Sequence, residues 1–231
     1  MTAASAFLAL WNDLAPGREA EYDTWHTREH VPERVASPGF RSGRRYVCRS
    51  HPAHRWFTLY DVADPGCFET PEYQDLLQNP TPWSASMRPD FRNFLRVPCT
   101  ALGSSGFGIG AALGVLRLPD EAALSALSQI VRDEGVVHAR IGRRADRNLA
   151  SGGFRAGAAG SGASDDFSAI LLIEALDRGA AVRAWAAAAA RFLPEGAVAP
   201  EHGGVYDLAF LFPGGDAAER LAHRRPHWPQ E

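Results

Sequence analysis

Two histidines and a tyrosine near the start of the chain recur at a spacing that suits proton transfer from one helix face. His26 and His30 are four residues apart, and Tyr22 lies four residues before His26, so a helix places the three side chains on one face. An imidazole exchanges protons near neutral pH. We therefore expect His30 to be an acid/base or substrate-orienting residue, with His26 and Tyr22 as further catalytic candidates. The alternative is a buried His30 that only bonds a nearby backbone carbonyl.

A histidine pair four residues apart also has the spacing of a two-histidine metal site. Position 27, where an HExxH motif has its glutamate, is Thr27, and no third ligand is evident in the sequence. Nothing in the sequence marks a proximal haem ligand either. We therefore expect neither a metal nor a cofactor at this helix.

Arg45 and Tyr46 complete the catalytic candidates. They are neighbours in a predicted strand and therefore point to opposite faces, so only one of them faces a barrel interior. Arg45 could hold a carboxylate or enolate oxygen of a substrate. The alternative for Arg45 is an ion pair with Glu29 or Glu33.

An aromatic pocket for a flat substrate is predicted beside these groups. Tyr46 could line it together with two aromatic residues of the next strand. Trp83 follows a Pro-rich loop over residues 79–83 and could close the mouth of the pocket, or could be an indole packed on a surface turn. The predicted substrate-binding residues are Trp25, Phe40, Trp56, Tyr60 and Trp83.

The composition excludes several kinds of chemistry and partner. All 24 basic residues are arginines, which excludes a lysine Schiff base and a P-loop lysine. The net charge of −3 argues against a nucleic-acid or membrane-surface partner, and no apolar run reaches the roughly 18 residues of a membrane span. The three cysteines lack CxxC spacing and the N-terminus does not resemble a signal peptide, so we expect a reducing, cytoplasmic compartment.

The two halves of the chain repeat one order of predicted elements, β-α-β-β-α-β. In the first half the hydrophobic pattern predicts strands over residues 6–14, 40–49, 55–62 and 91–100, and helices over 18–35 and 64–78. In the second half it predicts strands over 109–118, 136–143, 167–175 and 205–212, and helices over 120–134 and 178–192. A Gly/Ser linker is expected over 103–108, and a mobile loop rich in Gly, Ala and Ser over 148–165.

This order is that of the ferredoxin-like split βαβ unit, an antiparallel sheet with both helices on one face. The bare apolar face of each sheet must be covered. We therefore predict an α+β fold in which two tandem ferredoxin-like units, 1–102 and 103–213, pack their sheets into one barrel, with a tail over 214–231 as an appendage. The alternative is two separate domains on a flexible linker. Because residues 1–100 hold four of the six tryptophans and four of the five tyrosines, the first unit is expected to carry the site, unless it merely has a bulkier core.

The segment from Glu21 to Tyr46 resembles the EthD-like and related families of the dimeric α/β-barrel superfamily. In these families a helix with a tryptophan and, five residues later, a histidine precedes a Pro-Gly-Phe turn and an Arg-Tyr strand. Trp25, His30, Pro38-Gly39-Phe40 and Arg45-Tyr46 occupy those places. The resemblance covers about the first 100 residues and reaches the second half only through its element order. It implies the barrel fold, and a cleft between sheet and helix into which His30 points.

Together these observations predict a cofactor-independent enzyme that performs acid/base chemistry of the isomerase, cyclase or lyase kind on a small aromatic, lactone or polyketide-like molecule. The alternatives are a carrier that binds a small ligand without changing it, and a cofactor-free or haem-dependent monooxygenase. The resemblance implies that single-unit relatives dimerise to form the barrel. The duplication here therefore predicts a monomer with an internal pseudo-dimer, with a homodimer of whole chains as the other possibility.

Overall fold

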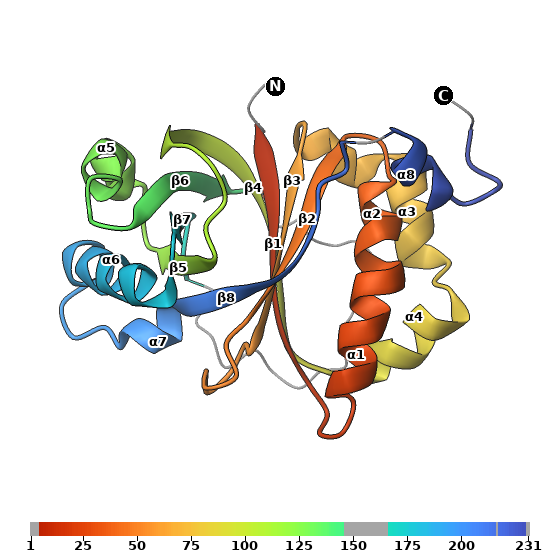
Figure 1. Ribbon diagram of the computed structural model, residues 1–231, viewed down its shortest axis with the longest axis horizontal. Helices are drawn as coiled ribbons and strands as arrows, with labels where there is room; N and C mark the ends of the chain where they lie inside the picture. Colours follow the sequence, from red (N-terminus) through yellow and green to blue (C-terminus); the bar gives the residue numbers. More distant parts are fainter. Residues whose placement is uncertain (1–4, 146–165, 216, 230–231) are drawn as a thin grey trace.

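Eight antiparallel strands close into one barrel. The computed structural model describes residues 5–145, 166–215 and 217–229, and the loop predicted over 148–165 lies outside them. The strands run in the order β1-β3-β2-β8-β5-β7-β6-β4, and β4 pairs back onto β1 (Figure 1). Their bounds are β1 (Ala6–Leu14), β2 (Phe40–Val47), β3 (Trp56–Val62), β4 (Phe91–Gly106), β5 (Ala112–Leu118), β6 (Val136–Arg144), β7 (Ala169–Ala175) and β8 (Gly203–Phe212).

Each half of the chain contributes four neighbouring strands in the ferredoxin-like order. The first unit supplies β4-β1-β3-β2 and the second supplies β8-β5-β7-β6. The units meet at two seams, where β2 pairs with β8 and β4 pairs with β6. The prediction of an α+β fold with two tandem ferredoxin-like units and packed sheets is therefore confirmed.

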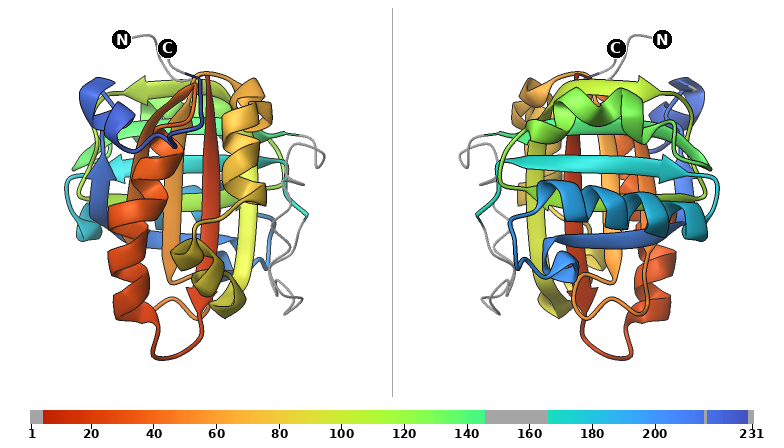
Figure 2. Two further views of the ribbon diagram at one scale, coloured as in Figure 1. Left: turned by 90° about the vertical axis from the view of Figure 1, so that its right-hand side faces the viewer. Right: turned by 90° about the vertical axis from the view of Figure 1, so that its left-hand side faces the viewer.

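Helices cover the outside of the barrel on two opposite sides (Figure 2). On the first unit, α1 (Glu19–Trp25), a π-helical turn (His26–His30) and α2 (Val31–Val35) form one continuous rod, followed by α3 (Pro71–Gln78) and α4 (Pro82–Met87). The second unit carries α5 (Leu127–Ile130), α6 (Arg178–Phe192) and α7 (Ala199–His202). After β8 the chain returns to the side of the first unit as α8 (Ala217–Ala222). Among the described residues, no helix has the length and apolar character needed to cross a membrane.

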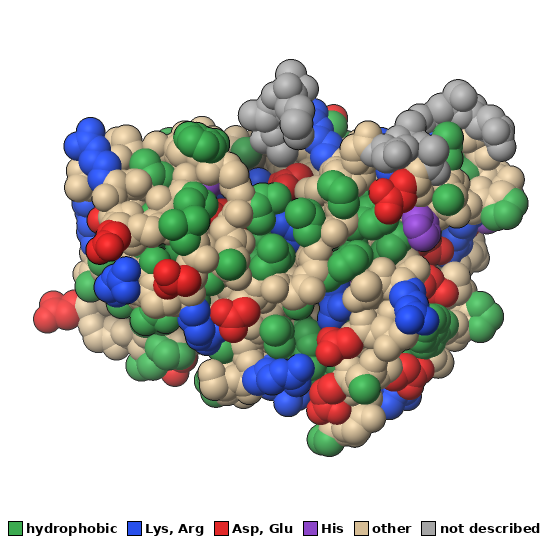
Figure 3. Space-filling view, viewed as in Figure 1, with side chains coloured by type: hydrophobic (Ala, Val, Ile, Leu, Met, Phe, Trp, Pro, Cys, Tyr) green, Lys and Arg blue, Asp and Glu red, His purple; other side chains and the backbone are tan. Residues whose placement is uncertain are grey.

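Side chains on the strands alternate between the barrel interior and the helix layer. Trp11 and Phe57 belong to the interior cluster, which also holds residues of β5, β7 and β8, whereas Leu8 and Tyr60 pack under the helices of the first unit. Because of this alternation, Arg45 and Tyr46, which are neighbours on β2, point to opposite faces of the sheet. On the face in Figure 3, acidic and basic side chains are interspersed among apolar ones.

A buried charge network, which we call the interior ion network, joins the two units inside the barrel. Arg44 lies 2.8 Å from Asp61 and 2.6 Å from Glu174, and Arg140 lies 2.5 Å from Asp61. Arg44 is 3% exposed and Glu174 is 1% exposed. Because Arg44 and Asp61 come from the first unit and the other two residues from the second, the network fixes how the units sit against each other.

Four predicted elements differ from the structure. The helix expected over 64–78 is a 3-10 turn (Pro65–Glu69) followed by α3. The expected linker over 103–108 is a strand as far as Gly106, because β4 continues to pair with β6 there. Residues 79–83 are not wholly a loop, because α4 begins at Pro82 and Thr81 caps it by accepting a hydrogen bond from the Ser84 amide. The helix expected over 120–134 is only a 3-10 turn (Ala122–Ala126) followed by α5.

Candidate active site

A small cavity lies between the sheet of the first unit and the helices that cover it. Its volume is about 50 Å³, which holds a few water molecules. A larger molecule therefore enters only when lining side chains or α4 move. The lining residues are Leu10, Asn12, Trp25, His26, His30, Arg34, Thr58, Tyr60, Tyr73, Leu77, Ser84, Arg88, Phe91, Phe94 and Arg96.

The two histidines occupy the π-helical turn between α1 and α2. Pro32 has no amide hydrogen and cannot bond the carbonyl four residues earlier, which accounts for an irregular hydrogen-bond ladder at this point. Ring centroids are 4.8 Å apart between His26 and His30, 4.2 Å between Trp25 and His30, and 4.9 Å between Tyr22 and His26. Tyr22, His26 and His30 thus lie on one face of the helix, as their spacing predicts. Such π-helical turns are frequent at functional sites.

Both imidazoles are held neutral. Burial lowers the pKa of His26 well below its usual range, and the charges of Arg45 and Arg34 lower this pKa further. Burial does the same to the pKa of His30, with added effects from Arg34, from His26 and from Arg88. Within the described part of the chain, the Nδ1 atoms of both histidines are buried without a hydrogen-bond partner. Each ring therefore keeps a lone pair at neutral pH and is suited to act as a base.

The cavity is electropositive. Arg34, Arg88 and Arg96 line it, and no aspartate or glutamate is among its lining residues. Arg34 is only 7% exposed. Burial lowers the pKa of Arg88, and the positive charges of Arg34 and Arg225 lower it further. An anionic group or a developing oxyanion would be stabilised at this position.

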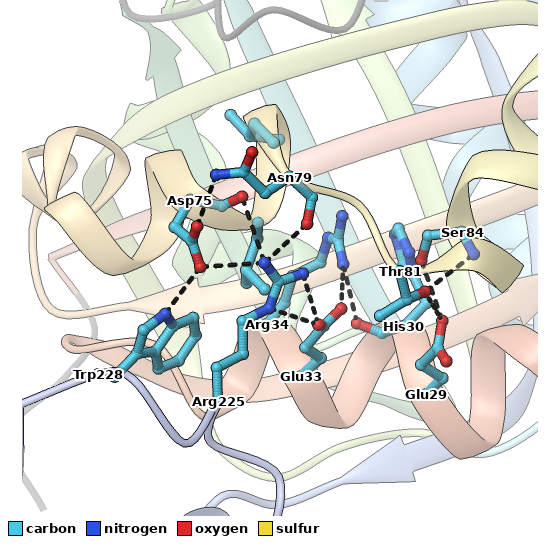
Figure 4. Close-up of polar contacts among 12 residues, drawn as sticks. Glu29, His30, Glu33, Arg34, Asp75, Asn79, Thr81, Ser84, Arg225 and Trp228 are labelled. Atoms are coloured by element: carbon cyan, nitrogen blue, oxygen red, sulfur yellow. Dashed lines mark hydrogen bonds and ion pairs between the residues drawn. The ribbon is translucent and has the colours of Figure 1, made fainter.

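A carboxylate just outside the cavity ties α4 to the histidine helix. Oε1 of Glu29 accepts hydrogen bonds from Thr81 at 2.6 Å and from Ser84 at 3.0 Å (Figure 4). It also accepts one from the Trp25 indole at 3.0 Å. All three donors are neutral, so the carboxylate charge is not paired by them. Glu29 therefore holds α4, which contributes Ser84 to the lining, in place beside the cavity.

The C-terminal tail is part of this half of the molecule, although the sequence predicts an appendage. Arg225 donates to Glu33 at 2.9 Å and to Asp75 at 3.0 Å, and the Trp228 indole donates to Asp75 at 2.9 Å (Figure 4). Trp228 is 5% exposed. Glu33 also lies 3.5 Å from Arg34, so the tail connects to the cavity through one shared carboxylate.

Four of the predicted site residues line the cavity: Trp25, His26, His30 and Tyr60. Tyr22 lies behind them, with its hydroxyl donating to Oδ1 of Asn12 at 3.1 Å. Burial raises the pKa of Tyr22 to about 12, so its phenol stays protonated. Burial also raises the pKa of Tyr60, whose hydroxyl has no partner among the described residues.

Arg45 and Tyr46 point to opposite faces of the sheet, as their adjacency predicts. Arg45 faces α1, lies 2.6 Å from Asp23 and donates to Thr27 at 2.6 Å. The alternative ion pair with Glu29 or Glu33 is wrong, because Arg45 pairs with Asp23, whereas Glu29 accepts from Thr81 and Ser84 and Glu33 pairs with Arg225. Tyr46 belongs to the barrel interior, where burial raises its pKa.

The predicted aromatic pocket is therefore divided between two faces. Tyr46 lies inside the barrel, whereas Tyr60 and Trp56 lie under the helices. Three predicted substrate-binding residues pack beside the cavity without lining it. Trp56 packs on Tyr22 at 5.5 Å between ring centroids, Phe40 stacks on Tyr73 at 5.1 Å, and the Trp83 indole donates to Glu21 at 3.1 Å.

The sequence did not predict most of the polar residues that line the cavity. Arg34 follows His30 by four residues, so helical spacing could have identified it. Thr58 precedes Tyr60 by two residues and shares its strand face. Arg88 and Arg96 carry no local signal, since only the tertiary fold brings them to the histidines. Among the described residues, no three His, Cys, Asp or Glu side chains gather as metal ligands.

The fold is shared with a solved structure of low sequence identity. No protein-family model matches the sequence, and no curated protein matches it. The chain is similar to the crystal structure of an anthrone oxidase-like protein, with a TM-score of 0.60 and 11% identity over 91% of this chain and 93% of that chain. This similarity supports the fold seen here, a dimeric α/β barrel formed within one chain.

Two further solved structures resemble the chain more distantly. The first is a monooxygenase-like protein from Listeria innocua, with a TM-score of 0.41 and 8% identity over 89% of this chain and 95% of that chain. The second is a chlorite dismutase from Candidatus Nitrospira defluvii, with a TM-score of 0.44 and 10% identity over 90% of this chain and 92% of that chain. None of these comparisons singles out the EthD-like family.

Proposed function

We propose that the chain is a cofactor-independent enzyme that removes a proton from a weakly acidic C–H or O–H group of a small aromatic, lactone or polyketide-like substrate. In this step a neutral imidazole nitrogen of His30 accepts the proton. The electron pair of the broken bond moves onto a substrate oxygen, which becomes an enolate or phenolate. Return of the proton at another atom, ring closure or loss of a leaving group completes an isomerase, cyclase or lyase reaction.

The observation that carries this proposal is a pair of neutral imidazoles surrounded by guanidinium groups. Burial and the nearby arginines lower the pKa of His30, which keeps the base unprotonated. The same cationic groups, Arg34, Arg88 and Arg96, would stabilise the oxyanion that forms when the proton leaves. The positive environment thus keeps the base free of a proton and would stabilise the oxyanion. It also weakens the imidazole as a base, so the imidazolium formed in the step would depend on the adjacent oxyanion as its counter-charge.

Convergence of perturbed titratable groups on one cavity supports an enzyme over a carrier. A carrier needs only an apolar pocket, whereas here His26 and His30 line the cavity and both have lowered pKa values. The three free, buried cysteines, Cys48, Cys67 and Cys99, support a reducing compartment such as the cytoplasm.

Hydrogen–deuterium exchange tests the proposal without knowledge of the final product. An anthrone, a 1,3-diketone and an aryl lactone are incubated with the protein in D₂O, and loss of the acidic proton is followed by NMR. The name of the anthrone oxidase-like structure makes an anthrone the first probe. We expect catalysed exchange with at least one probe, and a loss of about 100-fold or more in His30→Ala, since general acid/base catalysis contributes about that much.

His202→Gln on the second unit is the matched control and should leave exchange unchanged. Exchange in His30→Ala within a few-fold of the unsubstituted protein would refute the assignment of the base. Oxygen uptake that accompanies exchange would identify the anion as a reductant for dioxygen, and would move the assignment to a cofactor-free oxidase or monooxygenase.

A further inference from the structure

A second cavity, which we call the seam cavity, lies where the two units meet and shares no lining residue with the candidate active site. The loop before β3 and the start of β4 approach the end of β5 and α7 at this point. The volume is about 300 Å³, larger than that of the candidate active site. His51, His54 and Asn93 line it from the first unit, and Arg117 and Glu201 line it from the second.

Backbone strain is concentrated at the seam cavity. Among the described residues, His54 (φ 62°) and Asn93 (φ 48°) are the two non-glycine residues with positive φ, and both line this cavity. Asp13, which is 6% exposed, accepts hydrogen bonds from the amide of His54 at 2.8 Å and from the side-chain amide of Asn93 at 2.7 Å. One buried carboxylate thus holds both left-handed residues in place. Strain of this kind is found preferentially at ligand sites.

His54 contributes a buried polar atom without a partner to the lining of the seam cavity. His54 is 5% exposed, is hydrogen-bonded to the backbone of Asn93, and has an Nε2 atom that is buried without a partner in the described structure. Burial and the charge of Arg117 lower the pKa of His54 to about 4. The ring is therefore neutral and can accept a hydrogen bond.

Arg117 supplies a fixed cation from the opposite unit. Its guanidinium lies 5.8 Å from the centroid of Trp11 and 5.6 Å from that of Phe167. It donates hydrogen bonds to the backbone carbonyls of Glu201 and His202. These contacts fix the guanidinium beside the seam cavity, where its charge attracts an anion.

We propose that the seam cavity binds a small carboxylate that carries a hydrogen-bond donor next to the carboxyl group, as 2-hydroxy and 2-amino acids do. The carboxylate would face Arg117 and the donor would face Nε2 of His54. Glu201 at the rim disfavours a second negative charge and would favour an ammonium donor. This site stands apart from the proposed function and does not depend on it.

NMR titration of the full-length protein tests the proposal, with L-lactate, L-alanine and propionate as probes. The imidazole signals of His54 are identified by their loss in His54→Asn, since asparagine tolerates the left-handed backbone. Saturable shifts of these signals are expected with lactate or alanine, and binding about tenfold weaker with propionate, which lacks the donor. If Glu201→Gln weakens the binding of alanine but not that of lactate, the ligand class is the 2-amino acids.

The matched variants are Arg117→Gln and Arg132→Gln, the second being an exposed arginine of the same unit. We expect at least about tenfold weaker binding in the first and no change in the second. The absence of saturable shifts with all three probes at about 50 mM would overturn the proposal, since this concentration corresponds to very weak binding. Equal affinity for propionate and lactate, or equal affinity in the two arginine variants, would overturn it as well. The comparison of probes uses the unsubstituted protein and so remains decisive if a variant fails to fold.

Discussion

Replacing Arg44 by methionine tests how the two units are held together. In the interior ion network, Arg44 is the residue that contacts a carboxylate of each unit, at 2.8 Å from Asp61 and 2.6 Å from Glu174. After Arg44→Met, Asp61 retains Arg140 at 2.5 Å and the Ser42 hydroxyl at 2.9 Å. Glu174 retains the amide of Gly110 at 3.1 Å. The substitution therefore removes the one ion pair that Glu174 makes among the described residues and leaves Arg140 as the remaining positive charge that acts on it.

The expected loss is about 3 to 5 kcal/mol in the free energy of unfolding, the range for breaking a buried ion pair by removing one partner. Arg178→Met is the control, because the Arg178 and Asp207 side chains are 41% and 52% exposed and such pairs contribute at most about 1 kcal/mol. Glu174→Gln added to Arg44→Met should restore part of the loss, since the amide carries no charge.

The loss depends on pH in a defined direction. Burial already raises the pKa of Glu174, and removal of Arg44 raises it further. The folded variant then binds a proton that the unfolded chain releases above about pH 4.3. Its stability deficit should therefore be smaller at about pH 5 than at about pH 8. Urea unfolding at both pH values measures this, and a loss below about 1 kcal/mol, or an equal loss at both pH values, would refute the reasoning.

Three other perturbations test the remaining parts of the account. The ¹⁵N signals of His26 and His30 should stay those of neutral imidazoles as the pH falls through about 6.5, because the pKa of each is lowered; titration near that pH would contradict the assigned charge state. Glu29→Gln should loosen α4 and lower stability by about 1 kcal/mol, the value of a typical hydrogen bond, which thermal unfolding measures; unchanged stability and unchanged exchange of α4 amides would argue against its role as the link to α4. Residues 1–102 alone should self-associate or aggregate, because the sheet face that the second unit covers is apolar; a stable monomer with cooperative unfolding in analytical ultracentrifugation would count against the packed-unit interpretation.

The fold was predictable because it depends on patterns that are local in sequence. Apolar residues at every second position predict the strands, and aromatic and histidine residues at every third or fourth position predict the helix over residues 19–35. The need to cover the apolar faces of two sheets then predicts the barrel. The failures come from tertiary pairing. Residues 103–106 have the composition of a linker but form a strand, because β6 offers them an unpaired edge.

The candidate site was only half predictable, for a related reason. His26 and His30 share a helix and can be found by spacing, whereas Arg88 and Arg96 reach the cavity only when β4 and the segment before it fold against the helix. Arg225 contacts Glu33 across 192 positions of sequence, and no local pattern indicates such a contact. The opposite faces of Arg45 and Tyr46 were predictable, but which of the two faces the interior depends on the register of β2.

The pH profile of catalysed hydrogen–deuterium exchange tests the central claim most directly. If His30 is a neutral base in an electropositive cavity, the exchange rate of a responsive probe should stay level as the pH falls through about 6.5 and should decline only well below it, since its pKa is lowered. The same profile should be absent in His30→Gln. A rate that halves near pH 6.5, as for an ordinary histidine, or a full profile in His30→Gln, would contradict the account.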